Sequence, residues 1–456
     1  MQSKAAIILA AGKGTRMKSR LPKVLHKVCG KELIRHVVDA ASAAGYERIV
    51  VVVSPENQDA IHHLLGTTVE QVVQAEFLGT GHAVLQTQTL LSDTETIAVL
   101  NGDVPLIQPE TIRALWERHE ERAACVTLAT SMVNNPTVAR VVRDSTNAIT
   151  DIVEDQDTDE QTKKIKEINV GSYCFNGAWL WDALADVGPA DNGEFYLPAV
   201  VSAAVEQGTL VESVEVSDVA EALGINNRIQ LSEAEKWMRK RVREHWMMDG
   251  VSMADPSTVY IDSDASLGQD TSVLPNTHVI GKTQIGEGCV LGPNSIIEDS
   301  QIGHHCQVQS SVVEGSVLEA RVKVGPFSHV RPDSHLAEGA YLGNFAEVNR
   351  SRIGRNSKSG HFSYLGDADI GENVNIGAGT VTVNYDGMDK LPTRIGDGAF
   401  IGCDTMLIAP VTVGAGAQTA AGALVTKDVP ADALAVGMPA RLRERKDRSD
   451  TGEDSS

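Results

Sequence analysis

The feature that most constrains the fold is a six-residue repeat in the second half of the chain. Fourteen aliphatic-glycine pairs recur there, from Leu267-Gly268 to Val413-Gly414, and over long stretches one aliphatic residue returns every six positions, as at Ile395, Ile401 and Leu407. A period of six is neither the period of two of a strand nor the 3.6 of a helix. It is typical of hexapeptide repeats that wind into a β-helix. We therefore expect a left-handed parallel β-helix over residues 250–440.

The distribution of glycine and aromatic residues agrees with this prediction. Of the 40 glycines, 14 lie in residues 1–249 and 25 in residues 250–440, while aromatic residues make up only 4% of the chain. Glycine permits the tight corners of a coil, and a narrow triangular interior has little room for rings. A generic glycine-rich β domain is the alternative, but it would not keep the six-residue register. Two differently built halves are expected.

Before residue 226 the pattern changes to short β-rich runs between amphipathic stretches. The runs are 5–9, 48–53, 95–100 and 124–130. Continuous apolar runs with intervening helices predict a parallel sheet covered on both faces, which is a Rossmann-like α/β fold. Such sheets bind ligands at the carboxyl ends of their strands. We expect this first domain to span residues 1–226.

Three further segments complete the predicted organisation. Residues 227–249 are expected to form a linker helix, because Leu231, Ala234, Met238, Val242 and Trp246 follow the helical period and Ser232 with Glu235 fits a capping box. The register of the repeat breaks at 383–394, which predicts a loop extruded from the β-helix. The charged, apolar-poor residues 441–456 predict a disordered tail.

Charge and composition exclude several classes of partner. The formal net charge is −21, whereas a nucleic-acid binder needs a basic face. No apolar stretch approaches the roughly 18–20 residues of a membrane span, and the N-terminal apolar run is shorter than that of a secretory signal. The six cysteines contain no C-x-x-C pair, so neither zinc nor a disulfide framework is indicated. We expect a cytoplasmic protein that binds neither nucleic acid nor membrane.

Two motifs in the first half suggest a phosphate and metal site. Residues 9–17 read LAAGKGTRM directly after the first strand, and small residues there let backbone N–H groups approach a polyphosphate while Lys13, Arg16 and Lys23 supply charge. A glycine turn after a strand is, however, often only a turn. Asp103, in the motif NGDVP, follows another strand; it is either a turn or cap residue or a ligand for a hard cation that bridges phosphates.

These motifs, with LPKVLHKVCGK (21–31), QAEFLGTGHA (74–83), EIN (167–169) and GINNR (224–228), resemble those of the sugar-1-phosphate nucleotidyltransferases. Joined to a hexapeptide half, they resemble the bifunctional family that combines UDP-N-acetylglucosamine pyrophosphorylase with glucosamine-1-phosphate N-acetyltransferase. The resemblance covers nearly the whole chain. It implies acetylation of glucosamine 1-phosphate with acetyl-CoA by the second half, then transfer of UMP from UTP to the product by the first half, with release of pyrophosphate. The UDP-N-acetylglucosamine would feed peptidoglycan and lipopolysaccharide.

The resemblance also implies a set of residues for UMP transfer. The uridine nucleotide and its phosphates would be held by Leu9, Ala10, Ala11, Gly12 and Lys23, and the uracil ring by Gln74, Gly79 and Thr80. The motif residues Asn101 and Gly102 belong to the same site. Asp103 and Asn226 would coordinate Mg²⁺, and the sugar would contact Ala139, Glu154, Asn169 and Asn226. The family's glycine loop before Ala139 is one residue shorter here, in 136–140, so we expect its contact with the sugar to be altered.

For acetyl transfer, the densest polar cluster of the repeat region lies at 325–385. An isolated histidine is usually a surface residue, but an amine that attacks a thioester needs a base that titrates near neutrality, and imidazole meets this need. By resemblance His361 is the proton acceptor. Glucosamine 1-phosphate would contact Arg331, Asn349, Tyr364 and Asn375, and acetyl-CoA would contact Ala378, Asn384, Tyr385, Cys403 and Ala421.

Two departures from the family bear on this second site. Asn349 stands where a lysine that grips the sugar phosphate is usual, so one positive charge is missing unless Arg350 reaches in. Cys403 stands where serine occurs in other members. A monofunctional nucleotidyltransferase whose β-helix is a trimerisation or regulatory scaffold is the alternative, which Asn349 favours and His361 opposes. Hexapeptide acyltransferases form homotrimers, and by analogy a homotrimer is expected in which the loop at 383–394 reaches an adjacent subunit.

Overall fold

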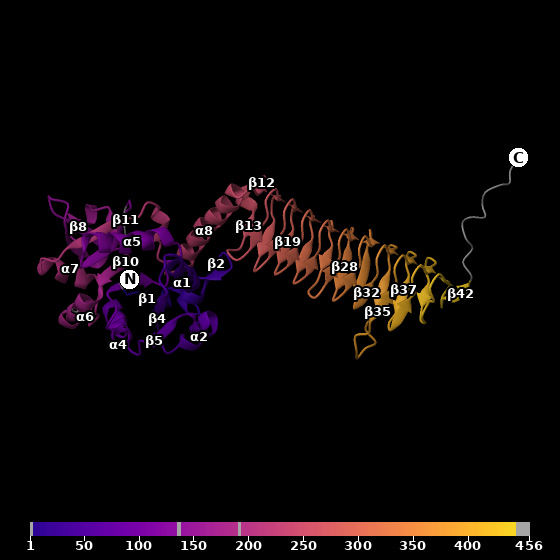
Figure 1. The fold of residues 1–456 in the computed structure, drawn as a ribbon, viewed down its shortest axis with the longest axis horizontal. Coiled ribbons are helices and arrows are strands. Elements are labelled where there is room, and N and C mark those ends of the chain that lie inside the picture. Colours follow the sequence, from indigo (N-terminus) through magenta and orange to yellow (C-terminus); the bar gives the residue numbers. More distant parts are fainter. Residues whose placement is uncertain (1–2, 135–137, 190–192, 444–456) are drawn as a thin grey trace. The chain divides into compact units, whose positions relative to one another are not determined.

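The computed structural model describes residues 3–134, 138–189 and 193–443 (Figure 1). The chain separates into two compact units, residues 1–238 and 239–456. The boundary between the units falls inside helix α8 (Arg228–Met248), within the segment expected to be a linker helix.

A twisted sheet forms the centre of the first unit. Its strands run in the order β11-β7-β10-β6-β1-β4-β5, with β8 and β9 attached through β10. The bounds are β1 (Lys4–Leu9), β4 (Arg48–Val53), β5 (Glu70–Val73), β6 (Thr96–Asn101), β7 (Val126–Met132), β8 (Arg140–Arg143), β9 (Ile149–Val153), β10 (Glu167–Asn176) and β11 (Val211–Glu215). The four predicted runs correspond to β1, β4, β6 and β7, with ends that differ by at most two residues.

Helices cover both faces of this sheet, because successive strand residues point to opposite sides. Ile7 and Val50 pack in one core with α3 (Thr80–Leu85), α6 (Gly177–Asp186) and α7 (Pro198–Glu206). Ile8 and Val51 pack in the other core with α1 (Leu33–Ala43), α2 (Gln58–Leu65) and α5 (Pro109–Arg122). A short helix, α4 (Gln88–Leu91), and the hairpin of β2 (Lys27–Val28) and β3 (Lys31–Glu32) also belong to this unit.

The expectation of a parallel sheet is wrong for three strands: β8 pairs antiparallel with both β9 and β10, and β10 is also antiparallel to its other neighbours. The ten-residue strand β10 lies between β6 and β7 and runs antiparallel to both. Its pairing with β7 shifts register between Asn169 and Tyr173, where Gly171 adopts a left-handed conformation with φ 81°. Such a bulge redirects side chains, and this one lies beside the predicted sugar ligand Asn169.

Helix α8 begins with a different cap from the expected one. The side-chain oxygen of Asn227 accepts hydrogen bonds from the backbone N–H groups of Ile229 and Gln230, so Ser232 lies inside the helix. Glu235, the supposed partner of Ser232, instead accepts a hydrogen bond of 2.7 Å from the backbone N–H of Cys29. The capping box is therefore not formed, because the helix starts one turn earlier and the glutamate has a tertiary partner.

The second unit is a left-handed parallel β-helix. From β12 (Ser252–Met253) to β37 (Met406–Ile408), each strand pairs in parallel with the strand three positions later, so three sheets form the sides of the β-helix. The first sheet contains β27 (Tyr341–Leu342), β30 (Lys358–Ser359), β33 (Asn375–Ile376), β36 (Phe400–Ile401), β39 (Gln418–Thr419) and β41 (Leu434–Val436). The second contains β25 (His329–Val330), β28 (Ala346–Asn349), β31 (Ser363–Gly366) and β34 (Val381–Val383). The third contains β26 (His335–Leu336), β32 (Ala368–Ile370), β35 (Thr393–Ile395) and β38 (Val411–Val413).

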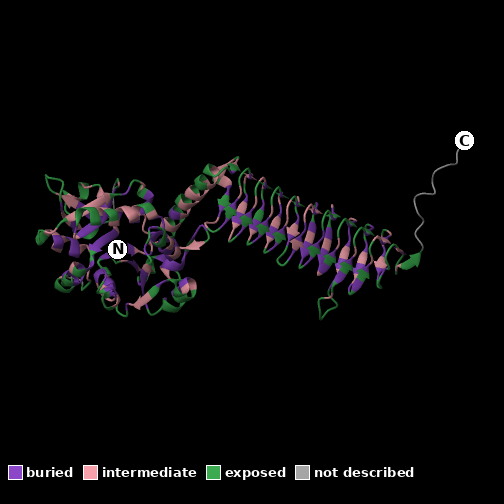
Figure 2. Ribbon diagram, in the orientation of Figure 1, coloured by how far each residue is buried: buried purple, intermediate pink, exposed green. Residues whose placement is uncertain are grey.

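The interior of the β-helix is aliphatic, as the repeat predicted. Ile395, Ile401, Leu407 and Val413 are all buried, and the buried cluster of the described coils contains no aromatic residue. In Figure 2 the buried residues form a continuous band through the coils. The rings lie outside instead: Phe327, Phe345 and Phe362 are 60%, 62% and 56% exposed. The low aromatic content therefore follows from the narrow interior.

The break in the repeat is a loop that leaves the β-helix between β34 and β35, below the coils in Figure 1. Tyr385 and Lys390 form an antiparallel bridge at its base. At the end of the chain, β42 (Arg441–Arg443) pairs antiparallel with β41. The predicted disordered tail therefore does not begin at residue 441, because residues 441–443 form a strand that pairs with the last coil. Residues 444–456 lie outside the described part of the chain.

Candidate active sites

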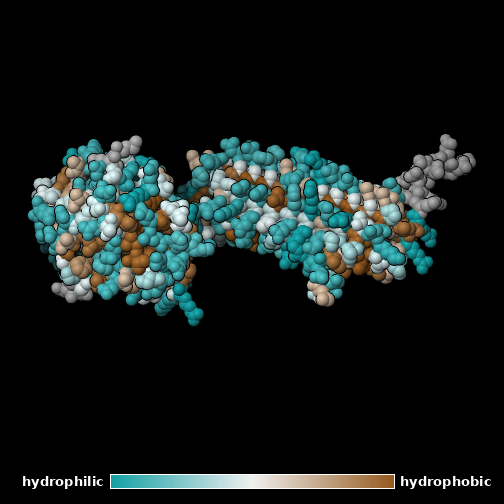
Figure 3. Space-filling view, turned by 60° about the horizontal axis from the view of Figure 1, so that its bottom comes forward, coloured by the Kyte–Doolittle hydropathy of each residue, from teal (hydrophilic) through white to brown (hydrophobic). Residues whose placement is uncertain are grey.

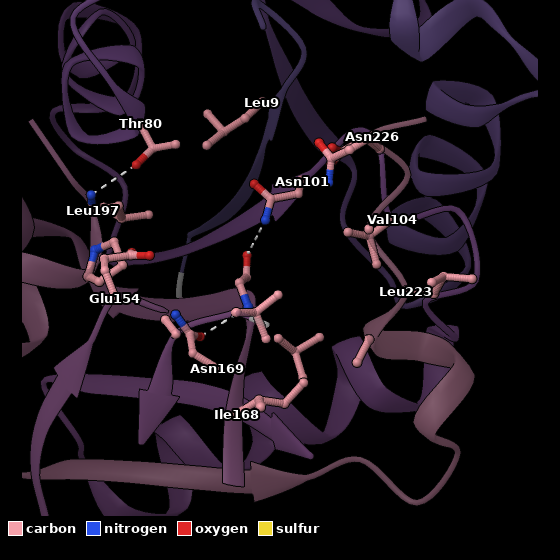
Figure 4. Close-up of a pocket in the computed structure, with 18 of the residues that line it drawn as sticks. Leu9, Thr80, Asn101, Val104, Glu154, Ile168, Asn169, Leu197, Leu223 and Asn226 are labelled. Carbon is pink, nitrogen blue, oxygen red and sulfur yellow. Dashed lines mark hydrogen bonds between the residues drawn. The ribbon is translucent and has the colours of Figure 1, made fainter. Parts of the chain in front are cut away.

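Two adjoining cavities open at the carboxyl ends of β1 and β6 in the first unit. Their volumes are about 260 and about 620 Å³, and both are lined by Leu9, Thr80, Asn101 and Asp103. The predicted residues Ala10, Ala11, Gly12, Lys23, Gln74 and Gly79 line the smaller cavity. The predicted residues Ala139, Glu154, Asn169 and Asn226 line the larger one (Figure 4). Apart from Gly102 and Lys13, every residue expected at this site borders one of the two cavities.

The smaller cavity lies against the glycine turn that follows β1. Gly12 follows β1, and a side chain there would meet no atom within 4 Å, so its backbone faces open space. Lys13 places its ammonium 4.5 Å from the ring centre of Phe77, which also lines the cavity. Gly102 borders neither cavity, but a Cβ there would lie 2.9 Å from the carbonyl oxygen of Leu9. Gly102 therefore permits β1 and β6 to approach each other at the site.

The far wall of the smaller cavity is fixed by hydrogen bonds around Gly79. Gln74 is 3% exposed, and its amide donates to the carbonyl oxygen of Gly79 over 3.1 Å. The hydroxyl of Thr80 accepts from the backbone N–H of Leu197. Gly79 itself has φ 98°, a conformation that favours glycine. These hydrogen bonds hold the wall in place around Gly79.

Asp103 and Asn226 converge on one point between the cavities. The Lys23 ammonium donates to the carboxylate of Asp103 and, over 3.2 Å, to the side-chain oxygen of Asn226. The Arg16 guanidinium donates to the same oxygen of Asn226 over 2.9 Å. A single cation thus reaches both oxygens, which is the arrangement a hard divalent metal needs. Since the described residues contain no cluster of three His, Cys, Asp or Glu side chains, the rest of a metal's shell would come from phosphate and water.

The larger cavity is more polar at one end. Figure 4 shows Thr80 and Glu154 on one side of it and Asn226 and Leu223 on the other. Burial raises the pKa of Glu154, and the nearby carboxylates of Asp157 and Asp155 raise it further. Such a carboxyl group is well suited to exchange hydrogen bonds with sugar hydroxyls.

The bulge in β10 aims two amides into this cavity. Asn169 accepts from the backbone N–H of Gly171 over 3.0 Å and donates to the hydroxyl of Tyr173. Asn101 donates to the carbonyl oxygen of Gly171 over 3.1 Å. Three aromatic residues that line the cavities were not predicted from the sequence: Tyr173 and Tyr196 in the larger cavity and Phe77 in the smaller one. Only Phe77 had a usable signal, since it lies inside the motif at 74–83.

In the second unit, a groove of about 570 Å³ runs along the first sheet of the β-helix. The predicted residues His361, Asn375, Ala378, Cys403 and Ala421 line it. Cys403 is the only exposed cysteine of the six, and none is in a disulfide. His361 lies between β30 and β31, at the corner where the chain passes from the first sheet to the second.

The remaining predicted residues gather at the opposite ends of the second sheet's strands. Arg331 forms an ion pair of 3.0 Å with Glu347. Asn384 donates to Asp367, and a Cβ on Gly366 would lie 2.5 Å from the Tyr364 hydroxyl and 2.6 Å from the Asn384 amide. Tyr385 is 53% exposed at the base of the loop. The structure therefore divides the predicted acetyl-transfer residues into a groove and a separate polar corner.

The positive charge of the family's usual lysine, which is missing at Asn349, is replaced in part by the adjacent Arg350. Asn349 is buried, and the Arg350 guanidinium lies 3.4 Å from its side-chain oxygen. Arg350 also forms two hydrogen bonds, of 2.8 and 2.9 Å, with Asp367. Arg350 and the amide of Asn384 lower the pKa of Asp367. Positive charge thus reaches this corner, although Asp367 already neutralises it.

Comparison with known proteins assigns the family. Residues 6–165 match the MobA-like NTP transferase domain, 264–299 the bacterial transferase hexapeptide and 392–427 the hexapeptide repeat of succinyl-transferase. "Bifunctional protein GlmU" of Halalkalibacterium halodurans is 47% identical over 97% of both chains. "Bifunctional protein GlmU" of Heliobacterium modesticaldum is 47% identical over 96% of both chains. The chain belongs to the bifunctional GlmU family.

Membership of the GlmU family makes this chain a bifunctional transferase. The nucleotidyltransferase fold occupies the first unit and the acyltransferase hexapeptides form the second. Transfer of a nucleotide to a sugar phosphate generally uses a divalent metal. Among the described helices, none combines the length and apolar character needed to span a bilayer.

Proposed function

We propose that the two sites catalyse successive steps in the synthesis of UDP-N-acetylglucosamine, a precursor of bacterial envelope polymers. The β-helix acetylates glucosamine 1-phosphate with acetyl-CoA. The first unit then transfers UMP from UTP to N-acetylglucosamine 1-phosphate and releases pyrophosphate. The observation that carries this proposal is the pair of adjoining cavities with Asp103 between them.

In the first unit, the smaller cavity takes the nucleotide and the larger one the sugar phosphate. The phosphate oxygen of the sugar attacks the α-phosphorus of UTP in line, the bond to the β-phosphate breaks, and pyrophosphate leaves. When bound, Mg²⁺ supplies neutralising charge to the phosphate oxygens. The task of Gln74, Thr80, Glu154 and Asn169 is to hold the two substrates in line, so no covalent intermediate is needed.

In the second unit, His361 takes a proton from the amine of glucosamine 1-phosphate. The amine nitrogen attacks the thioester carbonyl carbon, the carbon–sulfur bond breaks, and the thiolate of CoA leaves and is protonated. Arg331, Asn349 with Arg350, Tyr364 and Asn375 hold the sugar phosphate. Ala378, Asn384, Tyr385, Cys403 and Ala421 contact acetyl-CoA.

We further propose that the acetyl-transfer site is completed by a neighbouring copy in a homotrimer. The residues for each ligand are divided: Asn375 lies in the groove but Tyr364 at the polar corner, and Cys403 lies in the groove but Asn384 at the corner. The groove and the corner lie at opposite ends of strands such as β31, four residues or roughly 13 Å long. An adjacent β-helix would bring the corner of one copy to the groove of another.

Exposed apolar surface on the β-helix supports this association. Phe327 and Phe345 stack 5.4 Å apart, and both are more than half exposed. Met388, in the extruded loop, is 88% exposed. In Figure 3 apolar surface gathers over the C-terminal coils. These side chains would be covered by neighbouring copies, and the loop would reach the adjacent subunit.

Two variants separate the activities. Purified protein given acetyl-CoA and glucosamine 1-phosphate is expected to release CoA; His361→Ala abolishes this release and spares pyrophosphate release, because the base is lost only in the second unit. His335→Ala is the matched control, since His335 lies on the third sheet and pairs with Glu319. Asp103→Asn should give the opposite result. If the wild-type protein released no CoA, the β-helix would be a scaffold.

A further inference from the structure

Cations of the chain itself already join the two oxygens expected to hold the metal. Lys23 contacts Asp103 and Asn226 together, and Arg16 contacts Asn226. We infer that Lys23 competes with the divalent metal for Asp103 and Asn226, and that it releases them when a triphosphate offers its ammonium another anion. The inference rests on the proposed UMP transfer and concerns how the metal is admitted to that site.

The contact is built into the fold and is not an encounter of mobile surface side chains. The side chains of Lys23 and Asp103 are only 14% and 20% exposed. Lys23 begins a short 3-10 helix whose next residues, Val24 and Leu25, are buried. A Cβ on Gly14 would lie 2.6 Å from the Cβ of Lys23, so the glycine loop leaves room for the lysine stem at this place only because it lacks a side chain.

An ammonium in this position and a metal exclude each other. Mg²⁺ binds oxygen at about 2.0–2.1 Å, whereas an ammonium hydrogen bond is about 2.7–3.2 Å long. Because the ammonium and the metal would both lie within about 3 Å of the same two oxygens, they would occupy the same small space beside Asp103 and Asn226. Both are positive, and a partly buried site screens their repulsion poorly. A metal can reach Asp103 only after Lys23 has moved away.

The nucleotide pocket gives Lys23 its alternative partner. Lys23 lines the smaller cavity together with Ala11 and Gly12, where the triphosphate would lie. When the Lys23 ammonium turns away from Asp103, it would form a new ion pair with a phosphate oxygen in this cavity. The lysine would therefore exchange one anionic partner for another. Metal and triphosphate should consequently strengthen each other's binding, and this coupling is reciprocal.

Binding of Mn²⁺ alone, measured by electron paramagnetic resonance of the free ion, tests the inference without an activity assay. In the absence of nucleotide, Lys23→Met is expected to bind Mn²⁺ about tenfold or more tightly than the wild-type protein. Lys23→Arg, which keeps a cation, should stay near the wild type. Adding Asp103→Asn to Lys23→Met should remove the gain. Lys27→Met is the control, because Lys27 is 61% exposed and pairs with Glu32.

An affinity of folded Lys23→Met for Mn²⁺ that is equal to or weaker than the wild-type value would overturn the inference. If that variant did not fold, Lys23→Gln would be judged by the same criterion, with a thermal unfolding transition like that of the wild-type protein as the check that the first unit is folded. The test is independent of the proposed function. Wild-type protein that released no pyrophosphate would refute UMP transfer without affecting the Mn²⁺ result. Failure of the Mn²⁺ prediction would likewise leave UMP transfer unaffected.

Discussion

Replacing Gly79 by alanine should damage UMP transfer while leaving acetyl transfer intact. Gly79 has φ 98° and ψ 178°, a combination that residues with a side chain rarely adopt. The added Cβ would also lie 2.5 Å from the carbonyl oxygen of Phe195 and 2.8 Å from its nitrogen. Two effects therefore add: backbone strain at position 79 and a collision with the neighbouring backbone.

The size of the effect follows from what holds Phe195. Its carbonyl oxygen accepts from Gly81 over 2.7 Å, and its N–H donates to Leu78 over 2.7 Å. Phe195 cannot retreat without losing such a bond, which costs about 1 kcal/mol, and the strained backbone costs about 1–3 kcal/mol. The free variant is expected to relieve this strain by moving the wall, so restoring the wall for UTP costs about 2–4 kcal/mol, which is a loss of about 30- to 900-fold in kcat/KM for UTP.

The assay is pyrophosphate release at varied UTP, with CoA release measured on the same preparation. Gly188→Ala is the matched control, because a Cβ at that exposed position meets no atom within 4 Å and its φ is not left-handed. If Gly79→Ala stayed within twofold of the wild type in kcat/KM for UTP, the reasoning would be refuted. A parallel loss of CoA release would instead indicate general misfolding.

Two further predictions concern stability and assembly. Burial lowers the pKa of His119 to about 4, whereas a histidine of the unfolded chain has a pKa near 6.5, so the unfolded chain binds more protons between these two pH values. The free energy of unfolding should therefore fall as the pH drops from about 6.5 to 4, by at most about 3 kcal/mol. Denaturant titrations of His119→Gln should show a weaker dependence of stability on pH than the wild-type protein, and an equal dependence would contradict this reasoning. Phe345→Ser removes an exposed ring that stacks on Phe327. Sedimentation velocity should then show smaller assemblies, and CoA release should fall while pyrophosphate release is kept. An unchanged sedimentation coefficient would count against the trimer.

Local sequence patterns predicted the elements that carry their own signal. The strands β1, β4, β6 and β7 are continuous apolar runs, and the motif that follows β1 lies at the smaller cavity as expected. The β-helix was predictable because every coil repeats the same requirement for an inward aliphatic residue. The extruded loop was predictable for the same reason, since it interrupts that register.

Other features depend on partners that the local sequence does not reveal. The strand β10 has no pattern that indicates its direction, which is set by the strands on either side of it. Glu235 looked like the partner of Ser232 in a capping box, but the backbone N–H of Cys29 takes it. Tyr173 borders the larger cavity directly after the register shift that includes Gly171, which local sequence does not indicate.

The sequence by itself determined the two architectures and part of the lining of the cavities, because periodicity and short motifs act over a few neighbouring residues. Only the tertiary structure brought Lys23 to Asp103, 80 positions away, and to Asn226, 203 positions away. Only it divided the acetyl-transfer residues between a groove and a corner of the β-helix. Contacts between distant segments are fixed by strand order and packing, and both the proposed metal binding and the proposed subunit association depend on such contacts.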